Sequence, residues 1–187
     1  MFIQTESTPN PATLKFLPGR EVMGDGKVAD FDSPEAAARS PLAAQLFKVP
    51  HVARVFFGAD FISVSKTEGE WAHLKPTILG AIMEHFMHDR PLMEAGAYES
   101  ETEPTYEGEE AEIVEQIREL IETRVRPAVA SDGGDIIFKG YDGKTGVVSL
   151  HMRGSCAGCP SSTLTLKNGI ENMLRHYVPE VSAVEAV

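Results

Sequence analysis

The residues with the clearest capacity for chemistry are two cysteines, and both lie in one segment of this 187-residue chain, Gly154-Ser155-Cys156-Ala157-Gly158-Cys159-Pro160. Thiols at this spacing can bind a metal or an iron–sulfur cluster, or they can cycle between dithiol and disulfide. The glycines allow a sharp turn and let backbone N–H groups approach a bound cluster. Residues 1–6 have neither the basic nor the apolar region of a secretory signal. We therefore expect a reducing compartment, where structural disulfides are rare.

The elements around the cysteines are expected to be a strand before them and a helix after them. Alternation over residues 146–152 predicts the strand, and an apolar face over residues 166–177 predicts the helix. Ser161, Ser162 and Thr163 are available to cap the first turn of that helix. Because a helix N-terminus carries partial positive charge, we expect it to lower the pKa of the thiols and favour the thiolate, which binds soft metals.

The number of available ligands distinguishes an iron–sulfur cluster from zinc at the cysteine pair. A complete all-cysteine iron–sulfur site needs four thiolates, and this chain has two cysteines. Two protomers facing each other would complete the set and would place the cluster at the dimer interface. Zinc would need two further ligands, and the candidates nearby are His151, His176 and carboxylates. His176 falls opposite the apolar face of the last predicted helix, which favours a solvated side chain.

A dithiol oxidoreductase also places its cysteine pair between a strand and a helix. Here only 28 residues follow Cys159, which is too few for the strands and helix that a thioredoxin-like domain has after its motif. The close spacing of the two cysteines among glycines argues against the interpretation that they have no role. The residues alone therefore favour a cluster site, with the redox and zinc alternatives left open.

Hydrophobic periodicity on both sides of residues 93–110 predicts two small α+β domains, so the expected fold class is α+β. In the first half, Pro41 is expected to break a helix that begins at Ser33-Pro34. In the second half, Arg126-Pro127 is expected to end a helix over residues 113–125. The other expected elements are strands over 2–5, 13–17, 28–31, 52–57, 61–65, 135–139, 146–152 and 181–187, and helices over 71–89 and 166–177.

Negative charge is concentrated in one part of the chain. The formal net charge is −11, and residues 93–112 contain eight Glu with no Lys or Arg. Such a composition indicates a flexible acidic linker, which we place at residues 93–110 between domains at 1–92 and 111–187. The total charge excludes a broadly basic nucleic-acid-binding surface. The lack of an apolar run of about 18 residues argues against a membrane span.

Three other features are expected to have structural roles. Asp132-Gly133-Gly134-Asp135 lacks the spacing of an EF-hand and is predicted to be a tight turn into a hairpin. His85 borders the apolar face of its helix and His88 points to solvent, so neither is expected to bind a metal. The phenylalanines of the first half are expected in its core: Phe47, Phe56, Phe57, Phe61 and Phe86.

Two stretches resemble a known family. Ser131-Asp-Gly-Gly-Asp135 and Met152-Arg-Gly-Ser-Cys-Ala-Gly-Cys-Pro-Ser-Ser-Thr-Leu164 resemble the NifU C-terminal-like domain of Nfu iron–sulfur scaffold proteins, over about residues 111–185. The segment Ile3-Gln-Thr-Glu-Ser-Thr-Pro-Asn-Pro-Ala-Thr-Leu-Lys-Phe16 is similar to the N-terminal domain that accompanies it in alphaproteobacterial and mitochondrial Nfu proteins.

The resemblance implies a carrier rather than an enzyme, with no catalytic residues. It implies that Cys156 and Cys159 of two protomers together bind one [4Fe–4S] cluster, so that the cluster-bound form is a homodimer. The implied partners are apo iron–sulfur proteins and upstream cluster-assembly proteins, and the N-terminal domain would be an interaction module. We expect a bacterial cytoplasmic location, with the mitochondrial matrix as the alternative.

Overall fold

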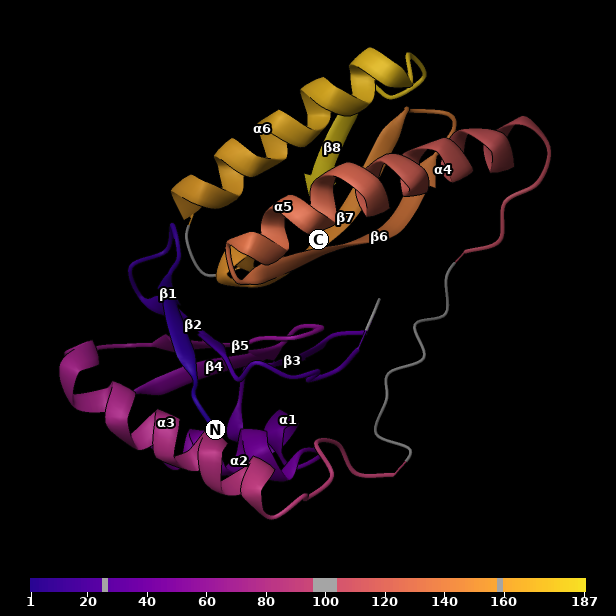
Figure 1. The fold of residues 1–187 in the computed structure, drawn as a ribbon. Coiled ribbons are helices and arrows are strands. Elements are labelled where there is room, and N and C mark those ends of the chain that lie inside the picture. The colour runs from indigo at the N-terminus through magenta and orange to yellow at the C-terminus, as the bar shows by residue number, and fades with distance from the viewer. Residues whose placement is uncertain (25–26, 96–103, 158–159) are drawn as a thin grey trace. The chain divides into compact units, whose positions relative to one another are not determined.

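The computed structural model describes residues 1–24, 27–95, 104–157 and 160–187, apart from the side chains of residues 160–162. The chain divides into two compact units, Met1–Glu99 and Ser100–Val187, each with helices and strands around a core of its own (Figure 1). These units have the predicted α+β class. Within the described residues, no helix combines the length and the apolar character that crossing a membrane requires.

The first unit is an antiparallel sheet with its helices on one face (Figure 1). The strands run in the order β1-β2-β5-β4-β3. Phe16, Val55 and Val64 belong to the core beneath the helices, and Val64 lies between two serines that point to the other face of the sheet. The elements are β1 (Gln4–Ser7), β2 (Thr13–Leu17), β3 (Ala29–Phe31), α1 (Pro34–Ala37), α2 (Pro41–Phe47), β4 (Val52–Phe57), β5 (Ile62–Lys66) and α3 (Trp71–Met87).

The predicted break at Pro41 is confirmed, because α1 and α2 are separate helices with their own caps. The Ser33 hydroxyl accepts the Ala36 N–H, and the Ser40 hydroxyl accepts the Ala43 N–H, each at 3.2 Å. Each cap is followed by a proline at the first helical position, where a missing N–H costs no intrahelical hydrogen bond. Local sequence alone therefore determines both helix starts.

The second unit is a three-stranded sheet in the order β6-β7-β8, in which β7 pairs antiparallel with β6 and parallel with β8. The helices α4, α5 and α6 lie on one face of this sheet (Figure 1). The elements are α4 (Glu109–Leu120), a π-helical turn (Ile121–Val125), α5 (Arg126–Ser131), β6 (Gly134–Asp142), β7 (Val147–Gly154), a 3-10 turn (Ser155–Ala157), α6 (Pro160–Tyr177) and β8 (Ala183–Ala186).

The predicted end of the first helix of this unit at Pro127 is wrong. The helix continues to Ser131 through the π-helical turn, in which the Arg126 N–H donates to the Ile121 carbonyl five residues earlier. In a regular α-helix the proline ring would collide with the carbonyl four residues before it, at Thr123. The wider turn changes that spacing, so the helix tolerates the proline without ending.

The described ends of the acidic segment pack onto the units. Met93 is buried in the core of the first unit, and the Glu94 N–H donates to the Arg39 carbonyl at 2.9 Å. At the other end, the Tyr106 hydroxyl accepts the Tyr141 N–H at 2.7 Å. Residues 96–103, the middle of the predicted flexible linker, lie outside the described residues.

Two side chains differ from expectation in their burial. Tyr177 was predicted on the buried face of α6 but is 48% exposed, because Ile170, Leu174 and Val178 fill the positions that face the sheet. His85, predicted at the border of an apolar face, is fully inside at 1% exposure.

Candidate functional site

Cys156 lies where β7 ends and the chain turns towards α6. Gly154 closes the strand with a φ of 64°, a left-handed conformation that glycine adopts without steric cost. The 3-10 turn Ser155–Ala157 carries Cys156 at its centre, and α6 begins at Pro160. The predicted order of strand, cysteine motif and helix is therefore confirmed for Cys156. Cys159, the other predicted ligand, lies outside the described residues.

Three hydrogen bonds hold this turn. The Ser155 hydroxyl donates to the Asp132 carbonyl at 2.5 Å, and the Ser155 N–H donates to the Gly133 carbonyl at 3.3 Å. From the other side, the Thr163 hydroxyl of α6 donates to the Cys156 carbonyl at 2.7 Å. Thr163, which the sequence offered as a helix cap, thus ties the helix to the cysteine turn.

Gly134 leaves room for the Cys156 side chain. A Cβ at this position would lie 2.5 Å from Cys156 Sγ and 2.8 Å from the Arg153 carbonyl oxygen. Such distances are well inside van der Waals contact, so any larger residue would displace the cysteine or the strand. The predicted turn at residues 132–135 is confirmed, and its second glycine forms the wall against which the thiol rests.

Burial changes the chemistry of the Cys156 thiol. The residue is 8% exposed and belongs to the core of its unit. Desolvation raises its pKa to about 11; the charges of Asp132 and Asp135 act in the same direction, and a hydrogen bond with Ser155 opposes them. The expected lowering of this pKa is therefore wrong for Cys156, because burial removes the solvent that would stabilise its thiolate.

A protonated thiol at neutral pH is compatible with metal binding, because coordination to a cation removes the proton. Binding of a cation at this sulfur would therefore be coupled to loss of its proton. The buried position also limits access of other thiols and of oxidants to Cys156.

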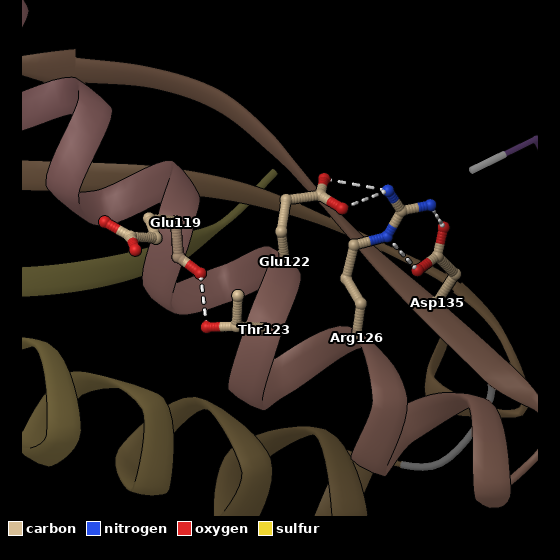
Figure 2. Close-up of polar contacts among 5 residues, drawn as sticks. All are labelled: Glu119, Glu122, Thr123, Arg126 and Asp135. Atoms are coloured by element: carbon tan, nitrogen blue, oxygen red, sulfur yellow. Dashed lines mark hydrogen bonds and ion pairs between the residues drawn. The ribbon is translucent and has the colours of Figure 1, made fainter. Parts of the chain in front are cut away.

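A cluster of charged side chains supports the other side of the turn. Asp135, 4% exposed, accepts two hydrogen bonds from Arg126, and the same guanidinium donates to Glu122 (Figure 2). Burial alone would lower the pKa of Arg126, but hydrogen bonds and charges from Asp135 and Glu122 outweigh it and raise that pKa. Sequence analysis missed this cluster. The i,i+4 spacing of Glu122 and Arg126 could have predicted their ion pair from the sequence. The contact between Arg126 and Asp135 could not be predicted in this way, because it forms between a helix and a strand of the folded unit.

The histidines considered for metal binding make other contacts. His151 Nδ1 is 2.7 Å from the Val187 carbonyl oxygen, and His176 is exposed with its ring centroid 5.0 Å from that of Tyr177. His85 is buried in the first unit, and neither of its ring nitrogens has a hydrogen-bond partner among the described residues. The described part of the chain has no group of three or more His, Cys, Asp or Glu side chains arranged to hold a metal ion.

Comparison with known families assigns both halves of the chain. Residues 3–89 match the family described as "Scaffold protein Nfu/NifU N terminal", and residues 117–185 match the "NifU-like domain". Both cysteines lie in the second match. The chain therefore combines an Nfu/NifU N-terminal domain with a NifU-like domain.

Curated relatives align with the whole chain. Two from Drosophila ananassae and Drosophila virilis are 52% and 51% identical over 188 residues, covering 100% of this chain and 64% and 62% of the relatives. Both are named "NFU1 iron-sulfur cluster scaffold homolog, mitochondrial". The chain thus spans slightly less than two thirds of the length of these relatives.

Among solved structures, the chain is similar to the solution NMR structure of a NifU-like protein from Saccharomyces cerevisiae. The TM-score is 0.46 at 26% identity, with 50% of this chain and 85% of that chain covered.

Proposed function

We propose that this chain is an iron–sulfur cluster carrier and not an enzyme. In this proposal two protomers each contribute Cys156 and Cys159 as thiolates to one [4Fe–4S] cluster, which is then delivered to apo-proteins. The cluster is cargo, so no bond in an organic substrate is broken. The names of the relatives and the family of both domains support the scaffold role.

The observation that carries the proposal is the position of Cys156 within the NifU-like domain. It lies in a tight turn between a strand and a helix, and its sulfur rests against a glycine. The second thiol follows three positions later in the sequence. Since one chain has two cysteines and a cluster held only by cysteines needs four, a second protomer completes the ligand set.

Delivery follows from the same ligand count. A client that presents its own thiolates replaces Cys156 and Cys159 one at a time, and each released thiolate takes up a proton. For Cys156 that proton is held firmly, because its pKa in the unloaded fold is about 11.

We further propose that the N-terminal unit, residues 1–92, is an interaction module that selects clients or upstream assembly proteins. Residues 93–110 would then connect it to the cluster domain at 111–187. Deletion of residues 1–92 should leave cluster uptake intact and slow transfer to particular apo-proteins. Unchanged transfer to every client tested would contradict this role.

We propose a mitochondrial matrix location for this carrier. The names of its curated relatives favour that alternative over the bacterial cytoplasm expected from the sequence. Fractionation of cells that contain the full-length protein, followed by immunodetection in purified matrix, tests this location.

The deciding experiment is anaerobic reconstitution with iron and sulfide. A brown protein with about four iron and four sulfide per dimer, and a dimeric mass, is the expected result. A holo-protein that stays monomeric would falsify the shared-ligand arrangement. A colourless protein that contains zinc would support a zinc-holding adaptor, and a colourless protein that reduces disulfides catalytically would support an oxidoreductase.

A further inference from the structure

The charged cluster beside the cysteine turn joins three elements through one guanidinium. Arg126 Nε and Nη2 donate to the two oxygens of Asp135, each at 2.9 Å, and Nη1 donates to Glu122 at 2.8 and 3.0 Å (Figure 2). The Asp135 side chain is only 5% exposed, whereas that of Glu122 is 58% exposed. The pair with Asp135 is therefore the desolvated one, in which geometry matters most.

The helix is built so that Arg126 reaches this strand. Pro127 requires the π-helical turn Ile121–Val125, and Arg126 is the first residue after that turn. The Thr123 hydroxyl donates to the Glu119 carbonyl at 2.6 Å on the same stretch (Figure 2). Pro127, which distorts the helix, thus directly follows Arg126, which binds the helix to strand β6.

Asp135 is one residue from the wall of the thiol site. Its neighbour Gly134 faces Cys156 Sγ, and Asp132 and Gly133 accept the two hydrogen bonds from Ser155. The turn into β6 and the first residue of that strand therefore contact the cysteine turn over three consecutive residues. Whatever holds this strand start in place also holds the surroundings of the sulfur.

The negative charge near the thiol site also indicates a role for Arg126. A cluster bound by thiolates would be anionic overall, and Asp135 places another negative charge one residue from Gly134, which faces Cys156 Sγ. Arg126 offsets the charge of Asp135 with two direct hydrogen bonds. Without Arg126, a carboxylate with almost no solvent contact would lose two charge-assisted hydrogen bonds, which favours opening of the strand start to water.

We propose that Arg126 is a positioning residue for the cluster-binding site, which acts through Asp135 by holding the start of β6 against the side chain of Cys156. This inference rests on the proposed function and adds to it a residue outside the cysteine motif. Arg126 binds no iron in this arrangement. It keeps the sulfur shielded and correctly placed before the cluster arrives, and it limits the opening of the site afterwards.

The first test measures the unloaded full-length chain. The Cys156 thiol is alkylated with iodoacetamide under reducing conditions, and the label is located by fragmentation of the peptide. Arg126→Gln is expected to increase the rate of Cys156 alkylation about tenfold, because two charge-assisted hydrogen bonds no longer oppose opening. Arg126→Lys, which keeps the charge but not the paired geometry, should restore part of the protection.

The matched control is Arg54→Gln in the first unit. Arg54 makes the same two-pronged contact with a nearly buried aspartate, Asp30. Its loss should destabilise that unit without changing the alkylation of Cys156. Circular dichroism on every variant confirms that the comparison is made between folded chains. If Arg126→Gln does not fold, Arg126→Lys alone must raise the alkylation rate relative to the Arg54 control.

The second test measures the loaded dimer. With excess chelator, the visible absorbance of the cluster should decay several-fold faster in Arg126→Gln than in the parent or in Arg54→Gln. Equal alkylation of Cys156 and equal decay in the two glutamine variants would overturn the positioning role. A parent protein that takes up no cluster would overturn the proposed function instead, and the alkylation test would still decide the role of Arg126.

Discussion

The two units contain the same arginine–aspartate chemistry in different surroundings. Arg54 on β4 binds Asp30 on the neighbouring strand β3, so this pair reinforces a contact that the strand ladder already makes. Arg126 joins a helix to the start of a strand that forms one wall of a thiol site. Similar pairs therefore have different consequences. The first contributes stability, and the second also determines how a reactive side chain is placed.

The largest expected effect is the loss of the ligand itself. Cys156→Ala should reduce the iron bound after reconstitution to background, because no other thiol can replace it at that position. Iron and sulfide analysis with the visible spectrum measures this. The control is Val129→Ala, which also shortens a buried side chain of the same core. Retention of the cluster in Cys156→Ala would contradict the assignment of this ligand.

The next largest effect is expected from replacing a glycine that faces a packed side chain, and each unit has one such glycine. Gly134→Ala would push a methyl group onto Cys156 Sγ, whereas Gly58→Ala would push one onto the ring of Phe61 in the first unit. Each change should cost about 1–3 kcal/mol of stability through overpacking. Only Gly134→Ala is expected to reduce cluster binding as well.

Denaturant titration separates the two glycine variants. Trp71, the only tryptophan of the chain, lies in the first unit, so its fluorescence follows that unit alone. Gly58→Ala should shift the fluorescence transition, and Gly134→Ala should leave it in place. A cluster yield that falls equally in both variants would break the distinction between the units.

A third expected effect is a pH dependence confined to the first unit. Burial foremost, with the charge of Arg90, lowers the pKa of His85 below 6.5. Just below pH 6.5, the His85 side chain therefore binds a proton in the unfolded chain but stays neutral in the folded unit. Stability is fully present above that pH and falls as the pH drops below it, by up to about 1.4 kcal/mol per pH unit, until the folded pKa is reached.

Urea titrations followed by Trp71 fluorescence between pH 7.5 and 5 measure this slope. His85→Leu, which keeps an apolar side chain in the site, should flatten the slope. In the described part of the second unit, both histidines are at least partly exposed. Its transition, followed by hydrogen exchange of β6 and β7, is expected to vary less with pH over this range.

The smallest expected effect concerns the end of the acidic segment. Tyr106→Phe removes the hydroxyl that accepts the Tyr141 N–H and leaves that N–H without its partner. The second unit should lose about 1 kcal/mol of stability, while the Trp71 transition stays unchanged. A cost of zero would indicate that the hydrogen bond between Tyr141 and Tyr106 contributes nothing to the stability of the unit.

Sequence patterns predicted the elements well where local chemistry decides them. Ser33, Ser40 and their following prolines determine two helix starts, and Gly133, with a φ of 80°, determines the turn before β6. The predicted helix end at Pro127 was wrong, because proline breaks a helix only where the hydrogen bonds have α-helical spacing. Here the π-helical turn changes that spacing, which sequence-based expectations rarely anticipate.

Prediction of the site was also uneven. Spacing and glycine content identified Cys156 as a ligand candidate, and the direction of its pKa shift was predicted wrongly. The effect of a helix terminus depends on which residues start the helix, whereas desolvation depends on which segments cover the sulfur. The second quantity is a property of packing and cannot be read from spacing.

The sequence by itself determined the two α+β halves, the acidic segment between them, the cysteine pair and the family, because these depend on periodicity, composition and local motifs. The tertiary structure alone decided that Cys156 is covered, that Gly134 is its wall and that Arg126 reaches Asp135. The physical reason is distance along the chain. Gly134 and Cys156 are 22 positions apart in sequence, and the strand pairing between β6 and β7 brings the sulfur to the glycine.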